Sequence, residues 1–176
     1  MPNRQSTASH WSEGVAELFV RERIRQIPYV PDAGHTQLIN LCHAHEELNA
    51  TPLTTEEEGV AQLCGAWLGG QRGALLLQSS GVGNCINMLA MVNECRFPLL
   101  MLVTMRGDWG EFNPWQIPMG RATPGVLHEM GVLVEKVDAP DRVVETVDAC
   151  ARIAFSTNRA AAVLIGQRVV GIKRWD

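Results

Sequence analysis

Residues 98–104, PLLMLVT, form an apolar run of strand length that ends at a threonine. A run without polar alternation is typical of a parallel strand that helices cover on both faces. Comparable runs lie at residues 74–78 and 161–165, and helix-like segments separate them. The sequence therefore predicts an α/β fold, an open, mostly parallel six-stranded sheet with helices on both faces.

The other expected elements continue this alternation outward from residues 98–104. One strand is expected near residues 28–30, and a brief second strand is expected to end at residue 53. Four further strands are expected over residues 74–78, 98–104, 132–137 and 161–165. Helices are expected over about 10–25, 35–47, 55–69, 84–94 and 141–155, with a short one after 121. Ligands bind beyond the carboxyl ends of parallel strands, so one site is expected from the loops at 31–35, 54–58, 79–84 and 105–116.

Composition narrows the class of protein. The 176 residues, 46% apolar and 19% charged, predict a single soluble domain over residues 1–176. A net charge of −4 without any Lys/Arg-rich run argues against nucleic-acid or anionic-membrane partners. The polar N-terminus and the lack of an apolar run of about 18 residues predict no membrane span and a cytoplasmic location.

The cysteines predict neither disulfides nor a metal site. Their number is odd, and they form no CxxC pair or Cys/His cluster of metal-ligand spacing. All five are expected to be reduced core residues: Cys42, Cys64, Cys85, Cys95 and Cys150.

Three consecutive glutamates, Glu56 to Glu58, stand at the head of an apolar helix. Thr55 and Glu58 have the T-x-x-E spacing of a capping box, which accounts for Glu58. The helical face of Glu56 continues through apolar residues, so its carboxylate should face the edge of the cleft. The face of Glu57 is comparable, and periodicity alone leaves the choice between Glu56 and Glu57 open.

Two other segments carry candidate polar groups. The SSGVGN stretch, residues 79–84, is expected to be a tight strand-to-helix loop whose glycines let a flat ligand approach the backbone. A nucleophilic role for Ser80 is disfavoured, because Gln78 replaces the first glycine of a G-x-S-x-G elbow. Arg106 follows the central strand and could clamp a carboxylate or sulfonate with its planar fork, or form a surface ion pair.

Three motifs carry a family resemblance: E-x8-G-A-W-L from Glu56, S-G-V-G-N from Ser80, and R-G-x-W-G-E from Arg106. With their surroundings they resemble the pyrimidine-binding domain of thiamine-diphosphate enzymes, in particular sulfopyruvate decarboxylase alpha subunits and phosphonopyruvate decarboxylases. The resemblance covers essentially the whole chain. It implies a thiamine-diphosphate-dependent decarboxylase that acts on a small anionic 2-oxo acid such as 3-sulfopyruvate or phosphonopyruvate.

The resemblance also implies roles for single residues. A glutamate nine residues before the helix glycine, here Gly65, hydrogen-bonds the aminopyrimidine ring in this family, which selects Glu56 as the catalytic acid. Cofactor contacts are expected from the S-G-V-G-N residues Ser80, Gly81, Gly83 and Asn84. Asp32 and His35 are expected to face the reacting carbon, with His35 also a catalytic candidate; a polar turn is the alternative for both.

What the chain lacks predicts its assembly. The G-D-G motif and downstream Asn that hold Mg²⁺ and diphosphate in this class are absent, since Trp109 replaces the second glycine in RGDWGEFN. The resemblance therefore implies a beta subunit that holds Mg²⁺ and the diphosphate, in an α2β2 or larger hetero-oligomer. A non-catalytic subunit, or a subunit of another thiamine-dependent lyase or carboligase, is the alternative. Trp109, Phe112 and Trp115 are expected either to close the 105–121 loop over the cofactor or to pack a subunit interface.

Overall fold

Six parallel strands form one sheet in the order β2-β1-β3-β4-β6-β5. The computed structural model describes the backbone of residues 5–172 and the side chains of residues 11–172. The strands are β1 (Ile24–Tyr29), β2 (Asn49–Pro52), β3 (Arg72–Gln78), β4 (Leu99–Thr104), β5 (Leu133–Val137) and β6 (Ala160–Ile165). This confirms the predicted open parallel sheet.

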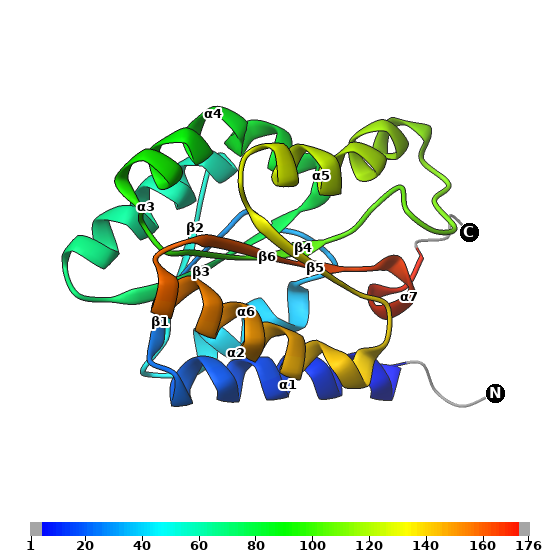
Figure 1. Ribbon diagram of the computed structural model, residues 1–176. Coiled ribbons are helices and arrows are strands. Elements are labelled where there is room, and N and C mark those ends of the chain that lie inside the picture. Colours follow the sequence, from blue (N-terminus) through cyan, green and yellow to red (C-terminus); the bar gives the residue numbers. More distant parts are fainter. Residues whose placement is uncertain (1–4, 173–176) are drawn as a thin grey trace.

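Helices cover both faces of the sheet (Figure 1). One layer contains α1 (Gln5–Arg21), α2 (Thr36–Ala44) and α6 (Val143–Thr157), and the other contains α3 (Glu56–Leu68), α4 (Ser79–Cys95) and α5 (Ile117–Glu129). Two short 3-10 turns, η1 (Pro114–Gln116) and η2 (Pro140–Arg142), and the one-turn helix α7 (Gln167–Val170) complete the described elements. In β4, Leu100 and Leu102 belong to one core and Met101 and Val103 to the other, as expected for a strand buried on both faces.

The register of the central strands aligns their carboxyl ends. Gln78 pairs with Thr104, and Thr104 pairs with Ile165. The segments that leave β3, β4 and β6 therefore start side by side at one edge of the sheet. This edge holds the residues that the sequence singled out.

Two element predictions were wrong. Residues 79–84 do not form a loop: α4 begins directly at Ser79, after Gln78 at the end of β3. The first helix ends at Arg21 rather than near residue 25, and Ile24 already belongs to β1. Arg23, with φ of 56°, lies in the left-handed region and terminates that helix before the buried strand.

The cysteines are all free, as predicted, but one placement was wrong. Cys42, Cys64, Cys85 and Cys150 are buried, whereas Cys95 is exposed. Cys95 is the last residue of α4, directly before the left-handed Arg96 that ends the helix away from the core. Burial raises the pKa of the Cys42 and Cys85 thiols to about 12, so these two groups are inert at neutral pH.

Candidate active site

Glu56 is the first residue of α3, and its side chain lies inside the fold. Glu56 is only 7% exposed, whereas Glu57 and Glu58 are both exposed. The Glu58 carboxylate accepts hydrogen bonds from the backbone N–H groups of Thr54 at 2.9 Å and Thr55 at 3.5 Å, which confirms the predicted capping box. The structure thus separates the three adjacent acids into one buried group, one cap and one surface group.

Helix α4 contacts the Glu56 carboxylate directly. The Asn84 amide Nδ2 donates to Glu56 Oε2 at 2.7 Å. Among the described residues no donor binds the other oxygen, Oε1, which lies against Gly81. A Cβ at position 81 would lie 2.2 Å from Oε1, so this close approach requires glycine. One carboxylate oxygen is therefore oriented by Asn84, and the other keeps its hydrogen-bonding capacity.

The remaining residues of the S-G-V-G-N motif have different surroundings. Ser80 is exposed, and its hydroxyl donates to Gln78 Oε1 at 2.9 Å. Gly83 is partly exposed, and a Cβ there would meet only Met119 Sδ at 3.6 Å. Because α4 starts at Ser79, Gly81 and Gly83 lie in its first two turns. The close approach of Glu56 thus requires glycine at position 81, whereas a Cβ at position 83 would make only an ordinary contact with Met119.

Asp32 links three strand ends. Its Oδ1 accepts from Gln78 Nε2 at 2.8 Å, and its Oδ2 accepts from Thr104 Oγ1 at 2.5 Å and from the Gly34 N–H at 3.0 Å. Burial opposes ionisation of Asp32, but these hydrogen bonds and the nearby His35 outweigh it and lower the pKa of the carboxyl. The ionised Asp32 carboxylate therefore connects the first loop to the ends of β3 and β4 by hydrogen bonds.

His35 lies in the core beneath this edge. Its side chain is fully buried, and its Nε2 is 3.0 Å from the carbonyl oxygen of Leu102 in β4. Its Nδ1 has no hydrogen-bond partner among the described residues. Burial lowers the pKa of His35, so the imidazole is neutral at pH 7. A substrate contact by His35 stays a prediction, and so does the alternative of a polar turn with a helix-starting histidine.

Arg106 forms a bidentate ion pair with Glu111. Arg106 Nε and Nη2 each lie 2.6 Å from one oxygen of the Glu111 carboxylate. The Glu111 side chain is 3% exposed and the Arg106 side chain 13% exposed. The hydrogen bonds from Arg106 overcome the effect of burial and lower the pKa of Glu111 to about 2. Glu111 is accordingly a carboxylate throughout the neutral range.

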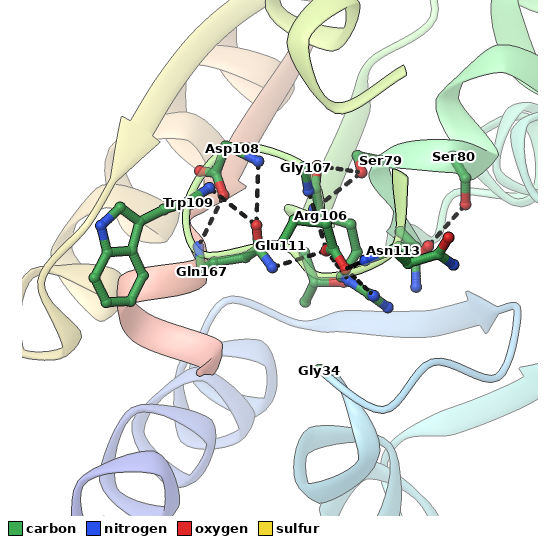
Figure 2. Close-up of polar contacts among 12 residues, drawn as sticks. Gly34, Ser79, Ser80, Arg106, Gly107, Asp108, Trp109, Glu111, Asn113 and Gln167 are labelled. Atoms are coloured by element: carbon green, nitrogen blue, oxygen red, sulfur yellow. Dashed lines mark hydrogen bonds and ion pairs between the residues drawn. The ribbon is translucent and has the colours of Figure 1, made fainter. Parts of the chain in front are cut away.

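Gln167, at the start of α7, connects this pair to the preceding loop (Figure 2). Its Nε2 donates to Glu111 Oε2 at 2.9 Å. Its Oε1 accepts from the backbone N–H groups of Asp108 at 3.1 Å and Trp109 at 3.0 Å. Gln167 is 1% exposed, so these hydrogen bonds are shielded from water. The segment from Arg106 to Glu111 is fixed rather than loose.

A small pocket lies between the first loop, the end of β4 and the C-terminal turn. Its volume is about 100 Å³, and its lining includes Asp32, Gly34, Thr104 and Arg106 on one part of the wall and the 170–172 segment on another. Two of the predicted substrate-binding residues, Asp32 and Arg106, therefore share one pocket. His35 does not line it.

The sequence reasoning missed Ser79, Glu111 and Gln167. Ser79 Oγ accepts from the backbone N–H of Arg106 at 3.1 Å, which ties the start of α4 to the end of β4. Glu111 is part of the quoted R-G-x-W-G-E motif, and an arginine and a glutamate flanking a glycine turn were an available signal. No signal in the sequence pointed to Gln167, because its hydrogen-bond partners lie about 60 residues away in the chain.

Comparison with curated proteins identifies relatives of similar length. The chain is 30% identical over 155 residues to the sulfopyruvate decarboxylase subunit alpha of Methanococcus maripaludis, covering 88% of this chain and 93% of that protein. It is 34% identical to the subunit of the same name from Methanothermobacter thermautotrophicus, covering 77% of this chain and 83% of that protein. The chain belongs to the sulfopyruvate decarboxylase alpha-subunit family.

Longer relatives of this alpha-subunit family match over part of their length. The sulfopyruvate decarboxylase of Methanosarcina acetivorans is 31% identical over 118 residues, which are 66% of this chain and 30% of that protein. The phosphonopyruvate decarboxylase of Streptomyces hygroscopicus is 31% identical over 153 residues, which are 37% of that protein. The same segment thus occurs as a separate subunit and within longer chains. No protein-family model matches the chain.

The fold of the alpha-subunit chain recurs in a larger enzyme. A 2-oxoglutarate:ferredoxin oxidoreductase from Magnetococcus marinus superposes with a TM-score of 0.75 at 15% identity, over 92% of this chain and 29% of that one. This likeness shows the fold alone. In residues 5–172, no helix is long and apolar enough to cross a membrane, and no group of three His, Cys, Asp or Glu residues could hold a metal ion.

Proposed function

We propose that this chain is the alpha subunit of a thiamine-diphosphate-dependent 2-oxo acid decarboxylase whose substrate is a small anion such as 3-sulfopyruvate or phosphonopyruvate. The observation that carries the proposal is the buried Glu56 carboxylate, which has one oxygen bound to Asn84 and the other free against Gly81. The names of the relatives support the reaction class.

The residues fit the pyrimidine end of the cofactor. A protonated ring nitrogen would donate to a carboxylate oxygen with an open lone pair, and Glu56 Oε1 provides one. The absence of a side chain at Gly81 lets the Glu56 carboxylate lie against α4, and a Cβ at Gly83 would make only one ordinary contact, with Met119. The start of α4 therefore presents little side-chain bulk to a flat ring. Ser80, exposed at the same helix start, is the other proposed cofactor contact.

Glu56 would share a proton with the ring nitrogen, and Asn84 would hold the carboxylate in place for that transfer. When bound, thiamine diphosphate supplies a thiazolium carbon that adds to the keto carbon and accepts the electron pair released with carbon dioxide. The work of this chain is then to bind and orient the pyrimidine and to hold a proton at Glu56 Oε1.

We propose that the remaining half of the active site belongs to a beta subunit that holds Mg²⁺ and the diphosphate. The chain nearly spans the relatives named alpha subunits but only 30% of the longer sulfopyruvate decarboxylase. The name subunit alpha, which the relatives of similar length carry, supports a partner subunit, and we propose an α2β2 or larger assembly. The free cysteines support the proposed cytoplasmic location, since thiols persist in reducing compartments.

We propose that the aromatic side chains after β4 contact the beta subunit. Trp109 and Phe112 are each 41% exposed and Trp115 is 86% exposed, which is unusual for large apolar groups. The Gln167 hydrogen bonds fix the backbone beneath Trp109, so this segment is suited to docking rather than to closing as a lid. Trp115→Ala should weaken subunit association by about tenfold or more in analytical ultracentrifugation. Unchanged association would remove Trp115 from the interface.

The function itself is tested by reconstitution. The chain, a beta subunit that co-purifies from the native cell, Mg²⁺ and thiamine diphosphate should together release carbon dioxide from 3-sulfopyruvate or phosphonopyruvate. The same mixture with Glu56→Gln should not. Equal release by both would leave a non-catalytic subunit as the better account.

A further inference from the structure

In its ion pair with Glu111, Arg106 uses only the edge of the guanidinium formed by Nε and Nη2. Glu111 takes hydrogen bonds from Nε and from Nη2, and among the described residues no other acceptor binds this guanidinium. The group carries five N–H donors in one plane, so Nη1 and the outer N–H of Nη2 remain free. A second anion can therefore bind beside Glu111 without displacing it.

Glu111 is held far more firmly than a simple ion pair requires. Besides the two contacts to Arg106, its carboxylate accepts from the backbone N–H groups of Gly107 at 3.3 Å and Asn113 at 3.0 Å and from Gln167 Nε2 at 2.9 Å. Figure 2 shows these groups converging on Glu111 from the loop and from the start of α7. These hydrogen bonds hold the carboxylate in one position, and its two contacts with Arg106 then fix the orientation of the guanidinium plane.

The backbone around Arg106 is equally constrained. Its N–H donates to Ser79 Oγ, and a Cβ on Gly120 would clash with its carbonyl oxygen. The ring of Phe112 lies 5.8 Å from the guanidinium carbon. The backbone, one edge and one face of this arginine are therefore fixed by its own chain. Its free edge is the part that remains for a ligand.

Arg106 is the cationic residue among those lining the pocket of about 100 Å³. Asp32, on the same wall, has both oxygens occupied by hydrogen bonds from Gln78, Thr104 and Gly34. An anionic group that enters the pocket can therefore pair only with Arg106 among the described lining residues. A guanidinium already held in place loses less side-chain freedom on binding than a mobile one does.

We propose that Glu111, itself held by Gln167, is a positioning residue that aims the free edge of Arg106 at the anionic group of the substrate. The proposal rests on the proposed function, and on Arg106 being the substrate contact. The opposite possibility is that Glu111 competes with the substrate for Arg106. The two roles predict opposite changes in KM when Glu111 loses its charge. KM rises if Glu111 positions Arg106, and it falls if Glu111 competes with the substrate.

The test uses the assembled, cofactor-loaded complex. Glu111→Gln keeps the size of the side chain but loses the bidentate carboxylate. We expect KM for 3-sulfopyruvate or phosphonopyruvate to rise about tenfold, kcat to change by less than about twofold, and calorimetric binding of the unreactive anion 3-sulfopropionate to weaken about tenfold. Arg106→Ala should show the same pattern at least as strongly.

A second variant and a control separate positioning from folding. Gln167→Met keeps the length of the side chain and adds no charge but removes the donor to Glu111, so it should raise KM in the same direction even where Glu111→Gln folds poorly. Glu145→Gln is the matched control, because it removes a comparable charge from an exposed pair with Arg142 at 2.7 Å. This control should leave KM and 3-sulfopropionate binding unchanged.

Contrary results have distinct meanings. An unchanged or lowered KM in Glu111→Gln, or an unchanged KM in Arg106→Ala, would overturn the positioning role. Deuterium exchange at the thiazolium carbon, which depends on Glu56, should be normal in the Glu111 and Gln167 variants. If that exchange is also normal in Glu56→Gln, the proposed function fails; if it is lost there while Glu111→Gln behaves as wild type, only the positioning role fails.

Discussion

Gly81 and Glu56 approach so closely that a Cβ on residue 81 would lie 2.2 Å from the carboxylate oxygen Oε1. Real Cβ atoms essentially never show such a contact, so an alanine would force the carboxylate or the backbone of α4 to move. The first turns of α3 and α4 are thus packed together through the Glu56 side chain. The contact with Glu56, rather than helix stability, explains a glycine at this position.

Gly81→Ala should impair the site and the fold together. We expect a loss of about 1–3 kcal/mol in the free energy of unfolding, measured by chemical denaturation, because the site is already filled by Glu56. Gly65→Ala in the neighbouring helix α3 is the matched comparison: nothing lies within 4 Å of the added methyl group. It should stabilise the chain by about 0.5–1 kcal/mol. Equal effects of the two substitutions would contradict the packing described here.

Glu58→Gln should affect only the helix end. The variant weakens the acceptor for the backbone N–H groups of Thr54 and Thr55, and we expect a loss of about 0.5–1 kcal/mol in the free energy of unfolding. Turnover in the assembled enzyme should stay near normal, since Glu58 is exposed. A large fall in turnover at unchanged stability would point to a chemical role for Glu58.

The Arg106–Glu111 pair should make stability depend on acid pH. The folded-state pKa of Glu111 is lowered from 4.5 to about 2, so its contribution is present above pH 4.5 and is lost as the pH falls toward 2. The loss should be on the order of 2 kcal/mol, measured as the free energy of unfolding across this range. In Glu111→Gln this part of the pH dependence should vanish; an identical pH profile would show that the pair contributes nothing.

The split-site proposal predicts weak cofactor binding by the chain alone. Without the proposed beta subunit, calorimetry should detect little binding of thiamine diphosphate, with or without Mg²⁺. Adding that subunit and Mg²⁺ should restore binding and decarboxylation together. Tight, magnesium-dependent binding by the isolated chain would contradict a site shared between two polypeptides.

Much of the fold followed from hydrophobic patterning. The runs at residues 98–104 and 161–165 are buried on both faces, and this alone indicates parallel strands under two helical layers. The error at residues 79–84 has a physical cause: glycines usually break helices, but Gly81 stands inside α4 because Glu56 occupies the space of its side chain. A contact between two helices decided the local structure, and no local pattern contains it.

The site could be predicted where the interacting residues are close together in the sequence. The cap formed by Glu58 agrees with its spacing from Thr55, whereas periodicity left Glu56 and Glu57 open and the structure shows that Glu56 is the buried one. The partner of Arg106 lay within a quoted motif, yet the sequence does not say whether an arginine meets a glutamate or a ligand. The Gln167 hydrogen bonds bridge segments about 60 residues apart, so only the three-dimensional structure reveals them.

The central claim is that Glu56 activates the cofactor, and deuterium exchange at the thiazolium carbon of the assembled complex tests it without the natural substrate. Glu56→Gln keeps the size of the side chain but cannot share an acidic proton with the aminopyrimidine, so the exchange rate should fall by about a hundredfold or more. Glu57→Gln, at the adjacent exposed position, is the control and should exchange normally. Normal exchange in Glu56→Gln, or a loss confined to Glu57→Gln, would contradict the assignment of Glu56 as the catalytic acid.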